Sequence, residues 1–106
     1  ISASFYIKEG DEFVKVVIED IDFIVGMKDY AKIVCGKNYY LVLKTLKALE
    51  EKLNDFNFIR VHKSYIIPLK KVTLYNNKSV LINFHEIPVG NSYKSGLKKY
   101  LEANKL

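Results

Sequence analysis

The stretch FIRVHKSYII, residues 58–67, determines the fold class that the sequence predicts. Aromatic and β-branched side chains dominate both halves of it, around a short polar centre. Such side chains prefer the pleated surface of a sheet, and polar residues between two apolar runs are typical of a turn. We therefore expect strands at residues 58–62 and 65–69. The expected core residues of this pair are Ile59, Val61, Tyr65 and Ile67.

Runs of the same kind lie on either side of this stretch. Residues 4–8 and 13–17 flank Glu9-Gly10-Asp11, and glycine beside aspartate supplies the backbone of a tight hairpin turn. In the strand expected at residues 21–25, Phe23 and Val25 should face one side. The other expected strands are residues 30–35, 39–44, 72–75 and 80–84, with turns at residues 36–38 and 76–78.

Two stretches change from a period of two to a period of 3.6, which indicates helices. At residues 45–53, Leu46, Leu49 and Leu53 form one apolar stripe, and Thr45 is the expected N-cap. The second helix is expected at residues 92–102. Its expected cap is Asn91 or Ser92. Strands do not alternate with helices, so we expect a mainly β fold of mostly antiparallel strands in small sheets or a partial barrel.

Length and charge limit the class of protein. The 106 residues suffice for one domain, residues 1–106, and no apolar run approaches the length of a membrane span. Residues 1–4, Ile-Ser-Ala-Ser, resemble no signal peptide and are expected to be a linker remnant. Residues 1–55 carry 8 basic and 10 acidic side chains, whereas residues 56–106 carry 9 basic and 2 acidic ones. This asymmetry suggests a basic face, although lysines that only confer solubility are the simpler explanation.

The sequence offers little for catalysis or metal binding. His62 and His85 lack ligand spacing, and the acidic residues near position 20 lack the pattern of a calcium loop. His62 and Ser64 would form a nucleophilic pair only with a third group and an oxyanion hole. His85 is expected to make local turn hydrogen bonds. Cys35, the single cysteine, is expected to be a small buried side chain. We expect no enzyme, no cofactor and no metal.

Cationic and polar side chains gather in three expected connections. Such groups bind phosphates, and the start of a helix adds free N–H donors. If the connections converge, they form a basic rim of loops. The candidate residues are Lys28 and Lys32 in the first connection, Arg60, His62 and Lys63 in the second, and Asn91, Ser92 and Lys94 in the third.

The order of these motifs resembles the LytTR DNA-binding domain. The resemblance covers about residues 5–101, and its most specific parts are FIRVHKSYII at residues 58–67 and IPVGNSY at residues 87–93. It implies about ten short strands with two short helices. It also implies the C-terminal output domain of a bacterial response regulator, which follows a phosphoacceptor receiver domain, inserts loops into successive major grooves and bends the DNA.

The resemblance assigns DNA contacts to the same three connections and adds Asp29, Tyr30, Ala31 and Ser64 to the candidates. Ala31 stands where some members carry a base-reading side chain, and it offers only a methyl group. Gly90-Asn91 stands where many members have Ser-Arg, so Asn91 would pair with adenine or hold a phosphate instead of reading guanine. Pro68 stands where the family often has asparagine, so that turn is expected to differ.

Two classes of function remain open from the sequence. The first is a cytoplasmic, non-enzymatic module that binds double-stranded DNA, on paired direct repeats and as a possible dimer. The second is a small β-barrel-like module for RNA binding or protein interaction, which would use exposed tyrosines on one open sheet face.

Overall fold

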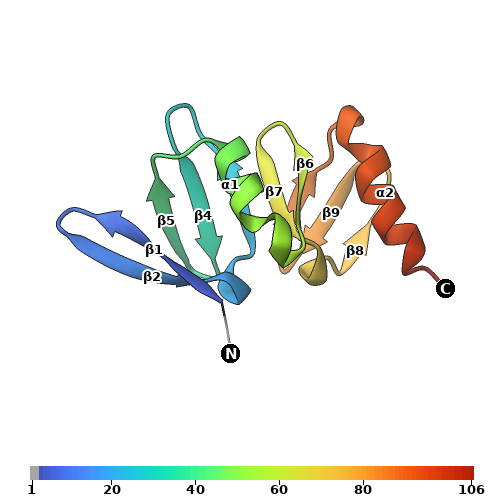
Figure 1. Ribbon diagram of the computed structural model, residues 1–106. Helices are drawn as coiled ribbons and strands as arrows, with labels where there is room; N and C mark the ends of the chain where they lie inside the picture. The colour runs from blue at the N-terminus through green and yellow to red at the C-terminus, as the bar shows by residue number, and fades with distance from the viewer. Residues whose placement is uncertain (1–2) are drawn as a thin grey trace.

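Three small sheets and two helices make up the computed structural model, which describes residues 3–106 (Figure 1). The strands are β1 (Ser4–Glu9), β2 (Glu12–Val17), β3 (Phe23–Gly26), β4 (Ala31–Cys35), β5 (Asn38–Val42), β6 (Phe58–His62), β7 (Tyr65–Pro68), β8 (Leu74–Tyr75), β9 (Ser79–Ile82) and β10 (His85–Pro88). The helices are α1 (Leu46–Leu53) and α2 (Lys94–Ala103). Short 3₁₀ segments are η1 (Ile18–Asp20), η2 (Asn54–Phe56), η3 (Leu69–Lys71) and η4 (Asn91–Tyr93).

The largest sheet lies between the two smaller ones. Its strand order is β5-β4-β3-β7-β6, the hairpin β1-β2 lies on one side of it, and the sheet β10-β9-β8 lies on the other. All strand pairs formed by residues 3–106 are antiparallel. The mainly β fold of ten short strands and two helices is thereby confirmed.

Two apolar clusters cover opposite faces of the central sheet. Alternate residues of each strand point to opposite faces, so neighbouring residues contribute to different clusters. Ile66 lies in the cluster on the side of the hairpin and α1, whereas Ile67 lies in the cluster beneath α2. The expected core residues Val61 and Ile67 are fully buried, and Ile59 and Tyr65 pack partly buried against them.

Strand β3 shows the same division. Phe23 and Val25 are only partly buried, whereas Ile24 between them is fully buried in the first cluster. Phe23 and Val25 therefore share one side of the strand, as expected, and the more buried side is the one that carries Ile24. A strand with apolar side chains on both faces gives no alternation from which to choose.

Strand β10 was missed. No strand was expected here and His85 was expected to make local turn hydrogen bonds, but the segment pairs with β9 from His85↔Ile82 to Pro88↔Ser79. The His85 ring packs edge-on against Phe23, with ring centroids 4.9 Å apart. The exposed polar residues and the proline hide the strand pattern, because Ile87 is its only buried residue.

The first helix begins and ends as expected, but the second does not. The Thr45 Oγ1 accepts a hydrogen bond from the Ala48 N–H at 3.1 Å, which makes Thr45 the N-cap of α1. The expected cap of the second helix is wrong. Asn91 and Ser92 belong to η4, and α2 starts after Tyr93 without a side-chain cap bond.

The three expected turns are present, and the expected linker remnant is partly a strand. Gly10 and Gly36 have φ angles of 63° and 62°, which confirms the two expected turns that favour glycine. The third turn is closed by Asn76, whose Oδ1 accepts hydrogen bonds from the N–H groups of Lys78 and Ser79. The expected linker remnant overlaps β1 at Ser4, and residues 1–2 lie outside the described part of the chain.

Candidate nucleic-acid interface

The three connections singled out from the sequence lie at one edge of the molecule. The β3–β4 and β6–β7 connections and the segment that leads into α2 all appear along the upper edge in Figure 1. Two backbone hydrogen bonds join them. The Gly26 N–H donates to the Ser64 carbonyl at 2.7 Å, and the Gly90 N–H donates to the Val61 carbonyl at 2.8 Å. The connections are therefore held at fixed positions relative to one another.

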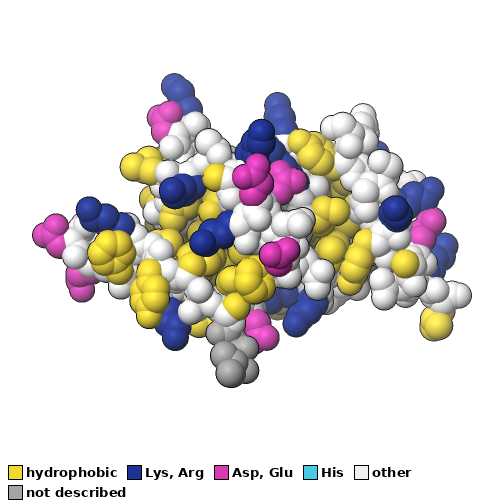
Figure 2. All heavy atoms as spheres, viewed as in Figure 1, with side chains coloured by type: hydrophobic (Ala, Val, Ile, Leu, Met, Phe, Trp, Pro, Cys, Tyr) yellow, Lys and Arg dark blue, Asp and Glu magenta, His cyan; other side chains and the backbone are white. Residues whose placement is uncertain are grey.

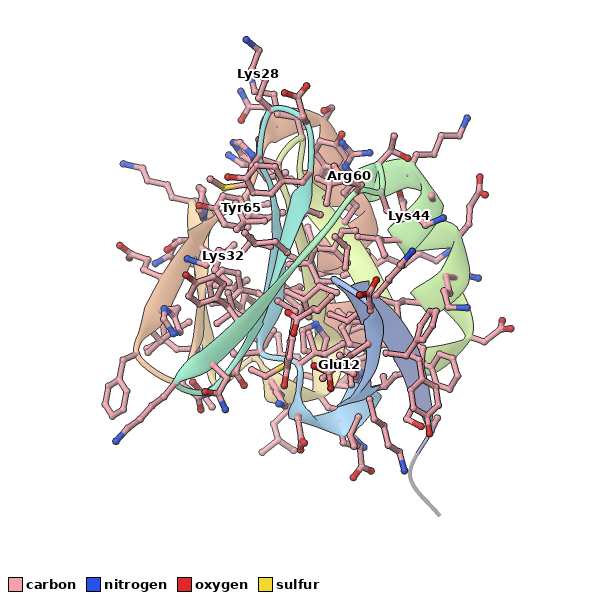
Figure 3. The ribbon with its side chains drawn as sticks, turned by 90° about the vertical axis from the view of Figure 1, so that its left-hand side faces the viewer. Glu12, Lys28, Lys32, Lys44, Arg60 and Tyr65 are labelled. Carbon is pink, nitrogen blue, oxygen red and sulfur yellow. The ribbon has the colours of Figure 1, made fainter. Side chains whose placement is uncertain are left out.

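The first connection presents a lysine and an aspartate. The Met27 N–H donates to the Tyr30 carbonyl at 2.7 Å and closes a turn, so that Lys28 and Asp29 are exposed. Figure 3 shows Lys28 at the tip of this edge and Lys32 further down the sheet. Tyr30, next to the two exposed residues, is partly buried.

Ala31 and Lys32 are less accessible than Lys28 and Asp29. Ala31 is fully buried in the first apolar cluster, so its methyl group cannot touch a ligand. Lys32 is partly buried on β4, with its Nζ 4.3 Å from the centre of the Tyr39 ring. This cation–π contact holds the Lys32 charge on the side of the sheet.

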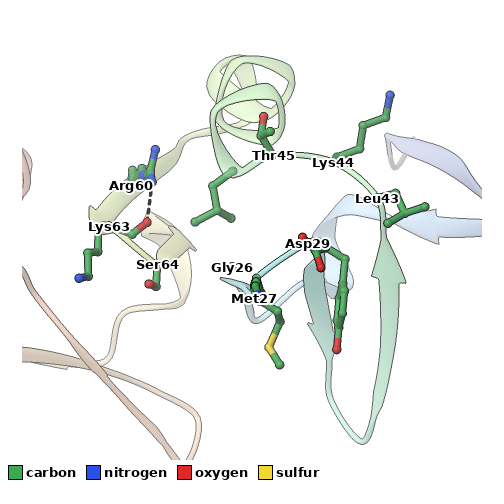
Figure 4. A pocket seen from close by; sticks show the side chains of 12 residues that line it. Gly26, Met27, Asp29, Leu43, Lys44, Thr45, Arg60, Lys63 and Ser64 are labelled. Carbon is green, nitrogen blue, oxygen red and sulfur yellow. Dashed lines mark hydrogen bonds between the residues drawn. The ribbon is translucent and has the colours of Figure 1, made fainter.

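The second connection is held by Arg60. Its guanidinium donates from Nη2 to the Lys63 carbonyl and from Nε to the His62 carbonyl at 3.4 Å (Figure 4). On its other side, Nη1 lies 3.7 Å from a carboxylate oxygen of Glu50 in α1. Arg60 thus connects the helix to the backbone of the β6–β7 connection.

His62 is also directed inward, which leaves Lys63 at the tip. The His62 Nδ1 accepts the Ser64 N–H at 3.1 Å, and its ring packs edge-on against Tyr65. A ring nitrogen that accepts a backbone N–H is not available as a general base for the Ser64 hydroxyl, and this arrangement argues against the nucleophilic pair. The Lys63 side chain is exposed.

The third connection brings Asn91 and Ser92 to the surface. The Tyr93 N–H donates to the Gly90 carbonyl at 2.9 Å and closes the η4 turn, and both Asn91 and Ser92 are exposed. A Cβ on Gly90 would lie 3.2 Å from the Tyr93 ring and 3.7 Å from the His62 Cα. The distance to His62 is an ordinary van der Waals contact, so glycine mainly relieves crowding against Tyr93 within the third connection. Lys94, partly buried, begins α2.

A cavity of about 380 Å³ lies between the first and second connections (Figure 4). Its charged lining residues are Lys28, Asp29, Lys44, Arg60 and Lys63. Lys44 was missed, because the sequence indicated only a strand end there. A lysine directly before a helix N-cap was the available signal, and the tertiary fold places it beside the two loops. Four cations and one carboxylate favour an anionic ligand at this edge.

The acidic side chain of Asp22 lies in another part of the fold. Asp22 is buried and accepts hydrogen bonds from the Lys71 Nζ at 3.0 Å and the Gly36 N–H at 2.9 Å. Burial alone would raise the pKa of Asp22, but these two hydrogen bonds and the Lys71 charge lower it below its usual value. Burial, together with the negative charges of Asp20 and Asp22, raises the pKa of the Cys35 thiol to about 11.

Two features are absent from the described residues, 3–106. These residues contain no group of three or more histidine, cysteine, aspartate or glutamate side chains that could hold a metal ion. Within the same part of the chain, no helix is long and apolar enough to cross a membrane.

Comparison with known proteins gives the family. The family model of the LytTr DNA-binding domain matches residues 11–102, which is most of the chain. The chain belongs to the LytTr DNA-binding domain family. The LytTr fold also appears in a solved structure, described as the LytTr DNA-binding domain of a putative methyl-accepting/DNA response regulator from Bacillus cereus. That structure superimposes with a TM-score of 0.77 and 20% identity, over 95% of this chain and 97% of the other.

Curated relatives of this LytTr chain are longer proteins. Sensory transduction protein LytT of Bacillus subtilis is 30% identical over 98 residues, which cover 87% of this chain and 41% of the relative. The protein of the same name from Enterococcus faecalis is 28% identical over 106 residues, which cover 94% of this chain and 44% of the relative. The chain therefore spans about two fifths of the length of these curated relatives.

Proposed function

We propose that this LytTr domain is the sequence-specific, double-stranded DNA-binding output domain of a bacterial two-component response regulator. The observation that carries the proposal is the gathering of three polar connections along one edge, around Lys28, Lys63 and Asn91. An acidic cluster between these connections would have argued against binding of a polyanion. The carboxylates at this edge are Asp29, next to Lys28, and Glu50, which pairs with Arg60.

The dimensions of the domain fit a duplex along this edge. The molecule measures 48 × 33 × 25 Å, and the three connections follow one another along its length. Successive openings of the major groove on one face of B-form DNA are about 34 Å apart. The first and third connections would enter successive major grooves, with the second near the phosphates between them, and DNA bending would improve the fit.

The exposed side chains divide into two roles. Lys28 and Lys63 would contact phosphates, which supplies affinity without sequence preference. Asn91 would read a base edge, because a side-chain amide forms two hydrogen bonds with adenine in the major groove. Arg60 and His62 would order the second connection from inside, since their polar groups are already engaged with its backbone.

The rest of a longer protein would supply regulation. An upstream receiver domain would bring two LytTr domains together on paired direct repeats, in the bacterial cytoplasm, and linkage of two modules would raise affinity over that of the isolated chain. This part of the proposal comes from the family and from the greater length of the curated relatives.

The RNA-binding alternative has less support. Its expected sign was a set of exposed tyrosines on one open sheet face. The most exposed tyrosines, Tyr6, Tyr39, Tyr75 and Tyr100, belong to β1, β5, β8 and α2, which are parts of different sheets and a helix.

Selection of bound duplexes from a random pool tests the proposal. The native chain should return a consensus with two conserved blocks about one helical turn apart. Asn91→Ala should lose preference at one position, by about 1–3 kcal/mol, with a smaller change in overall affinity. Ser92→Ala is the matched control in the same turn. If Asn91→Ala returns the native consensus, Asn91 does not read a base. If the native chain returns no consensus, the proposed function is wrong.

A further inference from the structure

A second surface, which is largely apolar, lies along the free edge strand of the central sheet. Strand β5 is the end strand of that sheet and pairs only with β4 among the described residues. An end strand leaves half of its backbone N–H and C=O groups without a strand partner. Beyond the strand pairs, the backbone hydrogen bonds of residues 3–106 include none from residues 38–44.

Large apolar side chains remain exposed on this free edge. Leu41 is 46% exposed, Tyr39 is 56% exposed, and Leu43, directly after the strand, is 82% exposed. Protein sheets normally protect such an edge with short, polar or charged strands, and a long apolar edge marks a place where another strand can pair. The exposed leucines therefore point to a binding surface.

A groove runs beside the edge. It encloses about 560 Å³ between the β1–β2 hairpin, β5 and α1, and its apolar lining includes Phe5, Ile7, Phe13, Leu41, Leu43 and Leu49. Figure 2 shows apolar side chains around this hollow, in the region where Figure 1 shows the hairpin, β5 and α1. The hairpin forms one wall and α1 the other, so an added strand would be held on both sides.

All charged residues that line the groove have the same sign. They are Lys8 from the hairpin, Lys44 from the β5–α1 connection and Lys52 from α1. The acidic side chains of the hairpin tip, such as Glu9 and Glu12, are not among the lining residues. An apolar floor with a cationic rim is complementary to a segment with apolar side chains and carboxylates.

We propose that the β5 edge binds an extended, acidic segment of a protein partner, which adds to the central sheet as a further strand. Backbone hydrogen bonds to β5 provide the affinity, alternate apolar side chains enter the groove, and flanking carboxylates meet Lys8 and Lys52. The groove shares only Leu43 and Lys44 with the cavity at the basic edge, and the proposal does not depend on DNA binding.

A short peptide tests the proposal directly. The probe is a capped peptide of about six residues, with valines in the centre and a glutamate at each end. Added to the 106-residue chain, it should protect backbone N–H groups of residues 39–43 from hydrogen exchange and shift their NMR signals. Two matched peptides serve as controls, one with lysine in place of glutamate and one with N-methylated backbone on alternate residues. Both should bind at least about tenfold more weakly.

Two double variants of the protein distinguish the effect on peptide binding of charge at the groove from that of charge elsewhere. Lys8→Glu/Lys52→Glu should weaken binding of the acidic peptide by about tenfold, because two attractions become repulsions. Lys99→Glu/Lys105→Glu makes the same charge change on exposed positions in and after α2 and should change binding by less than about twofold. All four lysines are exposed, so both variants should fold.

Several outcomes would overturn the proposal. One is absence of peptide binding at about millimolar concentration. Others are equal binding of the lysine or N-methylated peptide, or protection that lies outside β5. Competition of duplex DNA for the groove, or dimers of the chain that bury it, would assign the surface to another occupant.

Discussion

Arg60 illustrates how a residue of the candidate interface can order the backbone of that interface. Its side chain is 22% exposed, and its donors are directed to the backbone carbonyls of the second connection and to Glu50. A guanidinium offers several donors in one plane, which a lysine ammonium cannot reproduce. The position of Lys63 at the tip is thus determined by a residue three positions earlier.

We predict that Arg60→Lys weakens DNA binding and leaves its salt dependence unchanged. The variant keeps the positive charge but loses the forked contact, at a cost of about 1–2 kcal/mol. Amide exchange at Lys63 and Ser64 should become faster. The measurements are DNA titrations at several salt concentrations and hydrogen exchange on the free chain. Native affinity and native exchange rates in Arg60→Lys would contradict a positioning role.

Protonation of Asp22 at acid pH should lower the stability of the folded chain. Its pKa is lowered in the folded chain by Lys71 and the Gly36 N–H, against the effect of burial, which raises it. A lowered folded pKa means that the stabilisation is complete above the unfolded value of about 3.9 and is lost as the pH falls through the folded value. We predict that Asp22→Asn is less stable at neutral pH and loses less stability than the native chain between pH 6 and pH 2.5. Urea denaturation at each pH measures this. If both chains lose the same stability, Asp22 is not the group responsible.

At the scale of elements, the N-terminus of α1 lies beside the candidate interface. Thr45 caps the helix, and both Thr45 and Lys44 line the cavity between the first two connections. Thr45→Ala should destabilise the chain by about 1 kcal/mol, because one N–H of the first turn loses its acceptor. Thr45→Ser keeps the acceptor and is the control. A Thr45→Ala chain with native stability in urea denaturation would show that the cap contributes nothing.

The strands show where local pattern is informative and where it is not. The pairs around Gly10 and Gly36 follow from turn residues and alternation, and both were predicted with small errors at the ends. β10 was missed because Glu86 and Pro88 interrupt the pattern, and its pairing with β9 supplies what its own residues lack. The alternation in β3 did not indicate which of its faces is the more buried, because the sheet has a core on each side.

At the scale of the whole molecule, the edge should act as one surface. The connections of Lys28 and Lys63 are joined by the hydrogen bond between Gly26 and Ser64, and both lysines are exposed. We predict that Lys63→Ala lowers the slope of log affinity against log salt by about one, and that Lys28→Ala/Lys63→Ala lowers it by about two. Lys105→Ala, after α2, is the control. A double variant with the slope of either single variant would mean that one of the two lysines does not contact phosphate.

The amino-acid sequence alone was sufficient for the fold class, the two helices, the polar connections and the family resemblance. These depend on periodicity, turn residues and short motifs, which act over a few neighbouring positions. Only the tertiary structure decided which side chains of those connections remain free. Ala31 enters the core, Lys32 packs on Tyr39 and Arg60 bonds to the backbone, because partners distant in the chain compete for these groups. The open β5 edge has the same origin, since a strand becomes an end strand only when the whole sheet is assembled.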